Sequence, residues 1–289
     1  MTAAQLTLHA QPEMRDARLV LGFSGWMDGG EVSTGTIQTL VRKLDAKLLA
    51  QIDPEDFYIL NFPGSMEVSA LFRPHIKIED GLLTSYEGPT NAFYHSQAHR
   101  LILFVGKEPN LKWAEYARCL FAVVERFDVS AIYFIGSVAG LVPHTREPRL
   151  YSTVSSEQLK EGLERLGVRF SNYEGPGSFS TYLLRLCAQR SLPMATLVAE
   201  IPAYVQGRNF RCIEAVTRRL AAILGINIQL EDLRRLGDQL EERLSEVIKE
   251  HPELAERIHE LERDYDNEVF DTQMGDLKDW LEQQGIRLD

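Results

Sequence analysis

Cysteine is scarce in this sequence, and its arrangement argues against two kinds of site. The chain of 289 residues has three cysteines, Cys119, Cys187 and Cys212, which are widely spaced and form no CxxC pair. Dispersed cysteines of odd number make neither a disulfide framework nor a zinc site. The seven histidines are scattered, and no HExxH or DxDxDG motif occurs, so we expect no metal and no cofactor. The cysteines are predicted to be reduced core residues.

Long apolar runs and an excess of basic residues are absent as well. No stretch approaches the roughly 18 uninterrupted apolar residues of a membrane helix, and residues 1–19 show no basic segment followed by an apolar one. We therefore expect a cytoplasmic protein that does not bind membranes. Acidic residues outnumber basic ones by 42 to 31, giving a net charge of −11. This charge argues against nucleic-acid binding, because that function needs a basic face.

The charge imbalance is confined to one end of the chain. Residues 231–289 contain 19 acidic and 8 basic residues, a net of −11, so residues 1–230 carry 23 of each sign. Glycines also become rare after Gly225. The composition predicts two units, a neutral body over residues 1–228 and an acidic helical C-terminal appendix over residues 229–289.

Apolar runs alternate with helical patterns along the body. Strands are predicted at residues 19–21, 101–105, 131–135, 168–170 and 195–199, and helices near residues 32–44, 114–124, 156–166, 179–188 and 209–224. Runs that are apolar throughout are typical of parallel strands covered on both faces. The alternation predicts an α/β fold with a three-layer, mostly parallel sheet and helices on both faces. Residues 50–95 carry four prolines and are expected to form strands and loops.

The appendix has a different pattern. Leucines recur at three- and four-residue steps from Leu230 to Leu244, which predicts an amphipathic helix. Pro252 interrupts the pattern, because proline disfavours the α conformation in the residue before it. Shorter stripes over residues 254–261 and 277–281 predict two further helices. Two interpretations stay open: a helical hairpin packed on its own body, or an apolar stripe that meets a partner chain.

Polar residues follow the predicted strands at the edge where parallel sheets bind ligands. Ser24 and Asp28 lie in a segment with four glycines, residues 22–31, that precedes a helix. Backbone N–H groups at such a helix start suit an anion, whereas Asp28 could equally cap the helix. Lys107 and Glu108 follow the second strand, where they either line a pocket or lead into the next helix.

The remaining candidates lie after the third strand and further along the chain. A histidine and an arginine two residues apart, His144 and Arg146, can bind an anion or move a proton, although a lone histidine is more often a hydrogen-bonded loop residue. Glu174 and Glu200 add two carboxylates, which would suffice for general acid–base chemistry with that histidine. The complete set of candidate pocket residues is Ser24, Asp28, Lys107, Glu108, Ser137, His144, Arg146, Glu174 and Glu200.

Five sequence blocks carry a resemblance to a known family. They are GFSGWMDGG (residues 22–30), GKEPNLKW (106–113), GSVAGLVPHTREP (136–148), YEGPGSF (173–179) and EIPAYVQG (200–207). Together they resemble the PAC2 family of proteasome-assembly-chaperone-like proteins, the longer bacterial members in particular, over roughly residues 15–265. The resemblance implies a three-layer α/β domain similar to nucleoside phosphorylases and hydrolases. It also implies a homo-oligomer, with trimers among the bacterial members, and a helical C-terminal addition.

The resemblance implies less about function than about fold. Eukaryotic PAC2 members are chaperones that dock on proteasome α-rings, and some archaeal members dock through a C-terminal hydrophobic–Tyr–any tail. This sequence ends in Arg287-Leu288-Asp289 and lacks that tail. The bacterial branch brings no established reaction with it.

Two hypotheses from different classes follow, and whether the protein is an enzyme stays open between them. The first, which we favour, is a non-enzymatic, homo-oligomeric assembly or scaffold protein that binds a protein partner, with the acidic appendix as one surface for it. The second is a binding protein or enzyme for a nucleoside- or phosphate-like small molecule, with a phosphorylase- or hydrolase-like pocket at the carboxyl ends of the strands.

Overall fold

Four parallel strands form the middle of the molecule. The computed structural model describes the backbone of residues 5–283 and the side chains of residues 5–270. β2 (Ala17–Ser24), β7 (Leu101–Lys107), β8 (Val129–Gly140) and β11 (Met194–Pro202) lie in the order β7-β2-β8-β11. Successive residues of β2 are buried, as expected for a parallel strand covered on both faces.

Further strands, most of them paired antiparallel, extend this parallel core on both sides. β6 (Ala92–Ser96), β3 (Lys47–Ile52) and β1 (Leu6–Leu8) follow beyond β7, and β9 (Leu150–Ser152) and β10 (Arg169–Phe170) follow beyond β11. Within the described residues the sheet has nine strands, in the order β1-β3-β6-β7-β2-β8-β11-β9-β10. The sheet is therefore mixed, and its parallel part is the centre that the apolar runs predicted.

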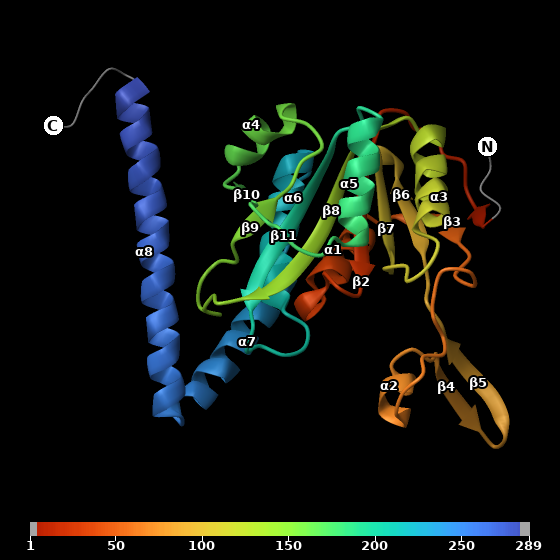
Figure 1. The fold of residues 1–289 in the computed structure, drawn as a ribbon, viewed down its shortest axis with the longest axis horizontal. Coiled ribbons are helices and arrows are strands. Elements are labelled where there is room, and N and C mark those ends of the chain that lie inside the picture. The colour runs from red at the N-terminus through yellow and green to blue at the C-terminus, as the bar shows by residue number, and fades with distance from the viewer. Residues whose placement is uncertain (1–4, 284–289) are drawn as a thin grey trace.

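Helices cover both faces of the sheet (Figure 1). On one face lie α1 (Val32–Lys43), α4 (Gln158–Glu164) and α6 (Phe210–Leu224), and on the other α3 (Trp113–Arg126) and α5 (Phe179–Gln189). Successive side chains of β2 point to opposite faces of the sheet. Val20 packs in the cluster that contains Ile37 of α1, and Leu21 packs in the cluster that contains Tyr116 of α3. The predicted three-layer α/β fold is confirmed. None of the helices among residues 5–283 is long and apolar enough to cross a membrane.

A buried serine holds the point where β2 and β8 separate. Gly22 and Ile135 are the last paired residues of these strands. Just beyond them, the Ser33 hydroxyl donates to the Ile135 carbonyl at 2.5 Å and accepts from the Phe23 N–H at 3.0 Å. A Cβ on Gly22 would lie 2.5 Å from Ile37 Cγ1. Glycine is therefore needed here for α1 to approach the strand closely enough to insert Ser33.

Residues 59–90 form an arm that projects away from the sheet (Figure 1). It contains α2 (Met66–Ala70) and an antiparallel hairpin of β4 (His75–Glu79) and β5 (Leu82–Glu87). Among the described residues no third strand pairs with this hairpin. Strands and loops were expected in residues 50–95, but a segment standing outside the core was not.

Asparagine side chains fix both ends of the arm. Asn110 Oδ1 accepts from the Ile59 N–H at 3.2 Å. At the other end Asn91, itself buried, lies with its Oδ1 2.7 Å from the Tyr58 hydroxyl and 3.0 Å from the Tyr116 hydroxyl. Burial raises the pKa of Tyr58 to about 12, so this hydroxyl stays a neutral hydrogen-bonding group at physiological pH.

Two helices make up the acidic C-terminal segment. α7 runs over Glu231–Lys249 and α8 over Pro252–Gln283. Leu230 and Leu233 belong to the core cluster beneath α6, so α7 begins in contact with the body. The break at Pro252 is confirmed, and proline occupies the first position of α8, where its missing N–H is tolerated. The two further helices predicted after it are wrong, because residues 254–281 lie in one continuous helix that no proline interrupts.

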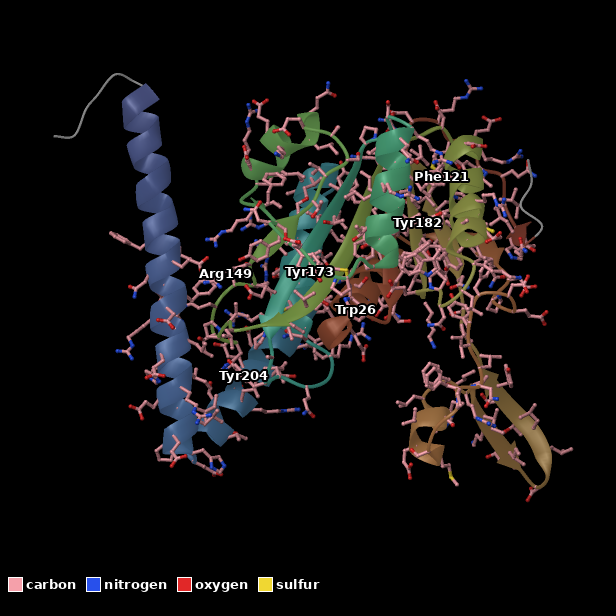
Figure 2. All side chains as sticks on the ribbon, viewed as in Figure 1. Trp26, Phe121, Arg149, Tyr173, Tyr182 and Tyr204 are labelled. Atoms are coloured by element: carbon pink, nitrogen blue, oxygen red, sulfur yellow. The ribbon has the colours of Figure 1, made fainter. Side chains whose placement is uncertain are left out.

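α8 lies beside the β9–β10 edge of the sheet (Figure 1) and is attached mainly by arginines of the body. The ion pairs are Arg146–Asp266 at 2.9 Å, Arg149–Glu268 at 2.6 Å and Arg169–Glu268 at 2.6 Å. Arg149 lies on the side of the body that faces α8 (Figure 2), and its guanidinium is 4.4 Å from the centre of the Tyr265 ring. Among the described side chains of α8, Ile258 alone is buried. The attachment is therefore mostly electrostatic.

High salt should loosen α8 before the rest of the protein. In 1 M NaCl the screening length falls to about 3 Å, and each exposed ion pair contributes up to about 1 kcal/mol at low salt. We expect amide hydrogen exchange in α8 to become about 5- to 20-fold faster between 0.1 M and 1 M NaCl. Exchange measured by mass spectrometry tests this, with the apolar-packed α3 as internal control. An α8 as salt-insensitive as α3 would contradict electrostatic attachment.

Candidate functional site

The loop after β2 is bound to the neighbouring strand and to α1. The Ser137 hydroxyl of β8 donates to the Gly29 carbonyl at 2.7 Å, and the Ser137 N–H donates to the Met27 carbonyl at 2.9 Å. The Asp28 carboxylate accepts from the Thr34 N–H at 3.0 Å and from the Thr34 hydroxyl at 2.8 Å. Burial raises the pKa of Asp28, and the bonds from Thr34 partly oppose this. Asp28 therefore holds the first turn of α1.

Glu108 connects three segments at the carboxyl end of β7. Its N–H donates to the Ser24 carbonyl at 2.9 Å. Its Oε1 accepts from the Phe179 N–H at the start of α5 at 2.8 Å, and its Oε2 accepts from the Trp26 N–H at 3.3 Å. The carboxylate thus occupies the position that an anion would take at a helix N-terminus.

Ser24 is the last residue of β2 and Lys107 the last residue of β7, and the two are paired with each other in the sheet. The Ser24 hydroxyl lies 3.5 Å from the Gly106 carbonyl oxygen, and the Lys107 ammonium lies 5.8 Å from the centre of the Tyr58 ring. With Asp28, Glu108 and Ser137, they make a first group of candidates around the loop between β2 and α1.

His144 is buried and paired with a tyrosine from the loop after β11. The Tyr204 hydroxyl lies 2.8 Å from both the backbone N and Nδ1 of His144. It accepts from the backbone N–H, and the tautomer of the ring decides which group donates in the contact with Nδ1; the other ring nitrogen is Nε2. That Nε2 is buried and has no partner among the described residues. Burial lowers the pKa of His144, while Glu262 raises it and Arg211 lowers it further.

Arg146 and Glu200 lie near His144 but already have charged partners. Arg146 binds Asp266 of α8, and Glu200 Oε2 lies 3.4 Å from Arg149 Nη1. The three candidates border a common cavity of about 20 Å³ beneath α7, which has room for about one water molecule. This second group is closed to any larger ligand while α7 and α8 are in place.

Glu174 belongs to neither group. It lies on the exposed loop over residues 171–177 between β10 and α5. The structure thus brings His144, Arg146 and Glu200 together, keeps the group around Asp28 separate, and leaves Glu174 apart from both.

A much larger cavity contains none of the nine candidates. Its volume is about 460 Å³, and it lies between β8, β9, β11, the start of α5 and the loops that carry Trp26 and Tyr173 (Figure 2). The described residues that line it are Trp26, Met27, Val138, Tyr151, Ser152, Thr153, Ser171, Tyr173, Pro176, Ser178, Ser180, Thr181, Leu184, Thr196 and Val198. Serine, threonine and tyrosine dominate the polar part of this lining. Such residues have no distinctive spacing, so sequence patterns could not have revealed them.

The cysteines lie in the core, as predicted. Cys119, Cys187 and Cys212 are all free and buried. Burial raises the thiol pKa to about 11 for Cys119 and to about 12 for the other two, so they are poor nucleophiles. Over the part of the chain with described side chains, no three histidine, cysteine or carboxylate residues gather in a way that could hold a metal ion.

Comparison with known families identifies the chain. The model of the PAC2 family matches residues 22–248, most of the sequence. The chain belongs to the PAC2 family. The match includes the loop after β2, the arm and nearly all of α7, and it ends before α8. No curated protein matches this PAC2 chain.

Solved structures share the fold of this PAC2 chain. Rv2714 of Mycobacterium tuberculosis, a protein of unknown function, has a TM-score of 0.82 at 20% identity over 96% of this chain and 94% of that chain. The proteasome-assembly chaperone homologue Rv2125 of the same organism has a TM-score of 0.72 at 26% identity, over 83% and 99%. PbaB of Pyrococcus furiosus, an archaeal proteasome activator, has a TM-score of 0.64 at 21% identity, over 86% and 99%.

The buried His144 should make the stability of the protein depend on pH. Its pKa in the folded protein lies below 6.5, so the unfolded chain takes up the proton first as the pH falls. The contribution of His144 to stability is complete above about pH 6.5 and is lost as the pH falls through the pKa of the folded state. The free energy of unfolding should therefore fall more steeply from pH 8 to pH 5.5 in wild type than in His144→Gln, by up to about 1 kcal/mol. Urea titrations at the two pH values measure it, with the exposed His75→Gln as control. Equal pH dependence in wild type and His144→Gln would contradict this assignment.

Proposed function

We propose that this PAC2-family protein is a non-enzymatic, homo-oligomeric assembly or scaffold protein of the cytoplasm. The arm over residues 59–90 carries this proposal. Two proteins share the fold of this chain and are described as a proteasome-assembly chaperone homologue, from Mycobacterium tuberculosis, and a proteasome activator, from Pyrococcus furiosus. These descriptions support a role in protein assembly.

The hairpin of the arm has one polar and one apolar face. Cross-strand partners share a face of a hairpin. The pairs His75–Glu87 and Lys77–Ser85 form the polar face, whereas Ile76–Tyr86 and Ile78–Leu83 form the apolar face. The four apolar side chains are 48–61% exposed. Further exposed apolar residues of the arm are Leu60, Phe62, Met66, Val68, Leu71 and Leu82.

An apolar hairpin of this kind needs a partner. An isolated two-stranded hairpin is at best marginally stable in water, and a contiguous exposed apolar surface is typical of a protein–protein interface. The occupant we propose is a second copy of the same chain. The strongly acidic α8 lies across the sheet from the arm (Figure 1), so the arm can approach a neutral body without strong charge repulsion.

A contact between the arm of one copy and the body of the next connects two different surfaces. Contacts of this heterologous kind close into rings when the rotation between copies permits. Leu141, which follows β8, is 77% exposed and supplies apolar surface on the body. We propose a closed ring, with a trimer as the stoichiometry.

Charges placed on the apolar face of the hairpin should dissociate the oligomer. Burying one large apolar side chain contributes about 1.5–3 kcal/mol, so Ile78→Asp together with Leu83→Asp should weaken association more than about 100-fold. Size-exclusion chromatography with light scattering should give a multiple of 32.8 kDa for wild type and a single chain for the variant.

The matched control uses the polar face of the same strands. Lys77→Gln with Ser85→Asp changes the net charge by the same amount as the test pair and should leave the oligomer intact. Dissociation by both variants would indicate a general charge effect, and a monomeric wild type would overturn the proposal.

The acidic appendix is the surface we propose for a protein partner. Glu253, Glu256, Glu260 and Asp264 of α8 are exposed and recur at three- and four-residue steps, so they lie along one side of the helix. The pairs with the body use other residues of α8. The stripe thus presents negative charge to solvent and fits a partner with a basic surface.

Neutralising this stripe should release the partner. A tagged chain purified at low salt from its own cells should retain one or a few proteins in near-stoichiometric amounts, as measured by quantitative mass spectrometry. Glu256→Gln, Glu260→Gln and Asp264→Asn together should reduce their recovery at least about 10-fold, in line with the loss of three charge contacts. The control is Glu55→Gln, Glu125→Gln and Asp128→Asn, which neutralises exposed carboxylates of the body. Partner recovery that is unchanged by the stripe variant would refute the appendix as the binding surface.

A further inference from the structure

The cavity of about 460 Å³ has the size of a small-molecule site. Its walls come from Val138 of β8, Ser152 of β9, Thr196 of β11 and Thr181 of α5, with the exposed Trp26 and Tyr173 on the flanking loops. Since these positions are far apart in sequence, the completed fold is what brings them together. The cavity is separate from the arm and from the stripe of α8, so its role is independent of the proposed assembly function.

The lining has one chemical character. Nine of the fifteen described lining residues carry a hydroxyl group and none carries a charge. Serine, threonine and tyrosine hydroxyls both donate and accept hydrogen bonds. The remaining lining residues are apolar, which provides surface for the carbon skeleton of a ligand. A site of this composition suits an uncharged molecule with several hydroxyl groups.

The start of α5 does not favour an anion in this cavity. Glu108 already accepts from the Phe179 N–H at 2.8 Å, and the Ser178 hydroxyl accepts from the Thr181 N–H at 3.4 Å. The carboxylate of Glu108 satisfies an N–H group that would otherwise attract a phosphate, and it repels a second negative charge. Inorganic phosphate is therefore a poor ligand for this position.

One buried hydroxyl of the lining has no hydrogen-bond partner among the described residues. Ser152 is 1% exposed, and its Oγ makes no hydrogen bond to a described residue. The neighbouring Thr196 hydroxyl, by contrast, accepts from the Thr153 N–H at 2.9 Å. A buried hydroxyl without a partner is unfavourable by about 1–3 kcal/mol, and a ligand with hydroxyl groups would supply the missing hydrogen bond.

From these observations we propose that the cavity binds an uncharged, hydroxyl-rich ring compound, the chemistry of a sugar. The ligand exchanges hydrogen bonds with the serine and threonine hydroxyls, including Ser152. Its apolar ring face packs on Trp26 or Tyr173, whose side chains are 71% and 68% exposed without it. A free saccharide and the ribose of a nucleoside share this chemistry, and the experiment separates them.

Binding can be followed by calorimetry on the full-length protein, and for the saccharide probes also by tryptophan fluorescence, to which Trp26 contributes with Trp113 and Trp280. The probes are glucose, maltose, uridine and inorganic phosphate, each raised to about 10 mM, the range of weak specific binding. We expect saturable binding of a saccharide or of uridine and none of phosphate. Saturation by maltose or glucose indicates a saccharide site, and saturation by uridine alone indicates a nucleoside site.

Ser152→Ala separates a ligand contact from a structural role. Removing an unpaired buried hydroxyl should leave the free energy of unfolding unchanged or higher, while the affinity for the bound probe falls about 10-fold. Ser96→Ala is the control, because the Ser96 hydroxyl is buried outside the cavity and paired with His99 Nδ1 at 2.9 Å. It should lower stability and leave affinity unchanged.

Three results would overturn the proposal. They are the absence of saturable binding by all three uncharged probes, saturable binding of phosphate, and an affinity that neither Ser152→Ala nor Tyr173→Ala reduces.

Discussion

The separation of β2 from β8 is the constraint on which the rest of this structure depends. Two neighbouring parallel strands that diverge inside a protein leave backbone N–H and C=O groups without partners, which is strongly unfavourable in an apolar interior. Ser33 of α1 satisfies one group of each kind, the Phe23 N–H and the Ile135 carbonyl. The gap then admits the loop after β2, and this loop in turn borders the large cavity through Trp26 and Met27. One side chain on a helix thus couples the packing of α1 to the shape of the strand ends.

The parallel centre of the sheet could be predicted because each of its strands is indicated by a short stretch of sequence on its own. Runs such as residues 101–105 are apolar at every position, and few environments other than a covered parallel strand suit such a run. The antiparallel edge strands β1 and β3 were harder to foresee, since they are only partly buried. The arm escaped prediction for another reason. Its apolar residues alternate as in a core strand, but no other segment of the described chain covers them.

The candidate site was predicted only in part. Position at a strand end indicated Asp28, Glu108 and Ser137, and each lies where expected and binds backbone or side-chain groups of its neighbours. Spacing could not show that Arg146 would face α8, because the sequence separates it from Asp266 by more than a hundred residues. The hydroxyls of the cavity carry no charge and follow no motif, so they become noticeable only when the fold gathers them around a common space.

In the proposed oligomer, the arm also makes the stability of the chain depend on its concentration. Its two ends are anchored on Asn91 and Asn110, while its apolar surface is open to solvent in a single chain. Anything that binds the folded state stabilises it by mass action, and in the proposed oligomer the binding molecule is another copy of the protein. At low concentration the sheet would stay folded, whereas the arm would be the least stable element. The arm would then be the preferred site of cleavage by a protease. Resistance to limited proteolysis within residues 59–90 would therefore measure the fraction of the protein that has associated with other copies.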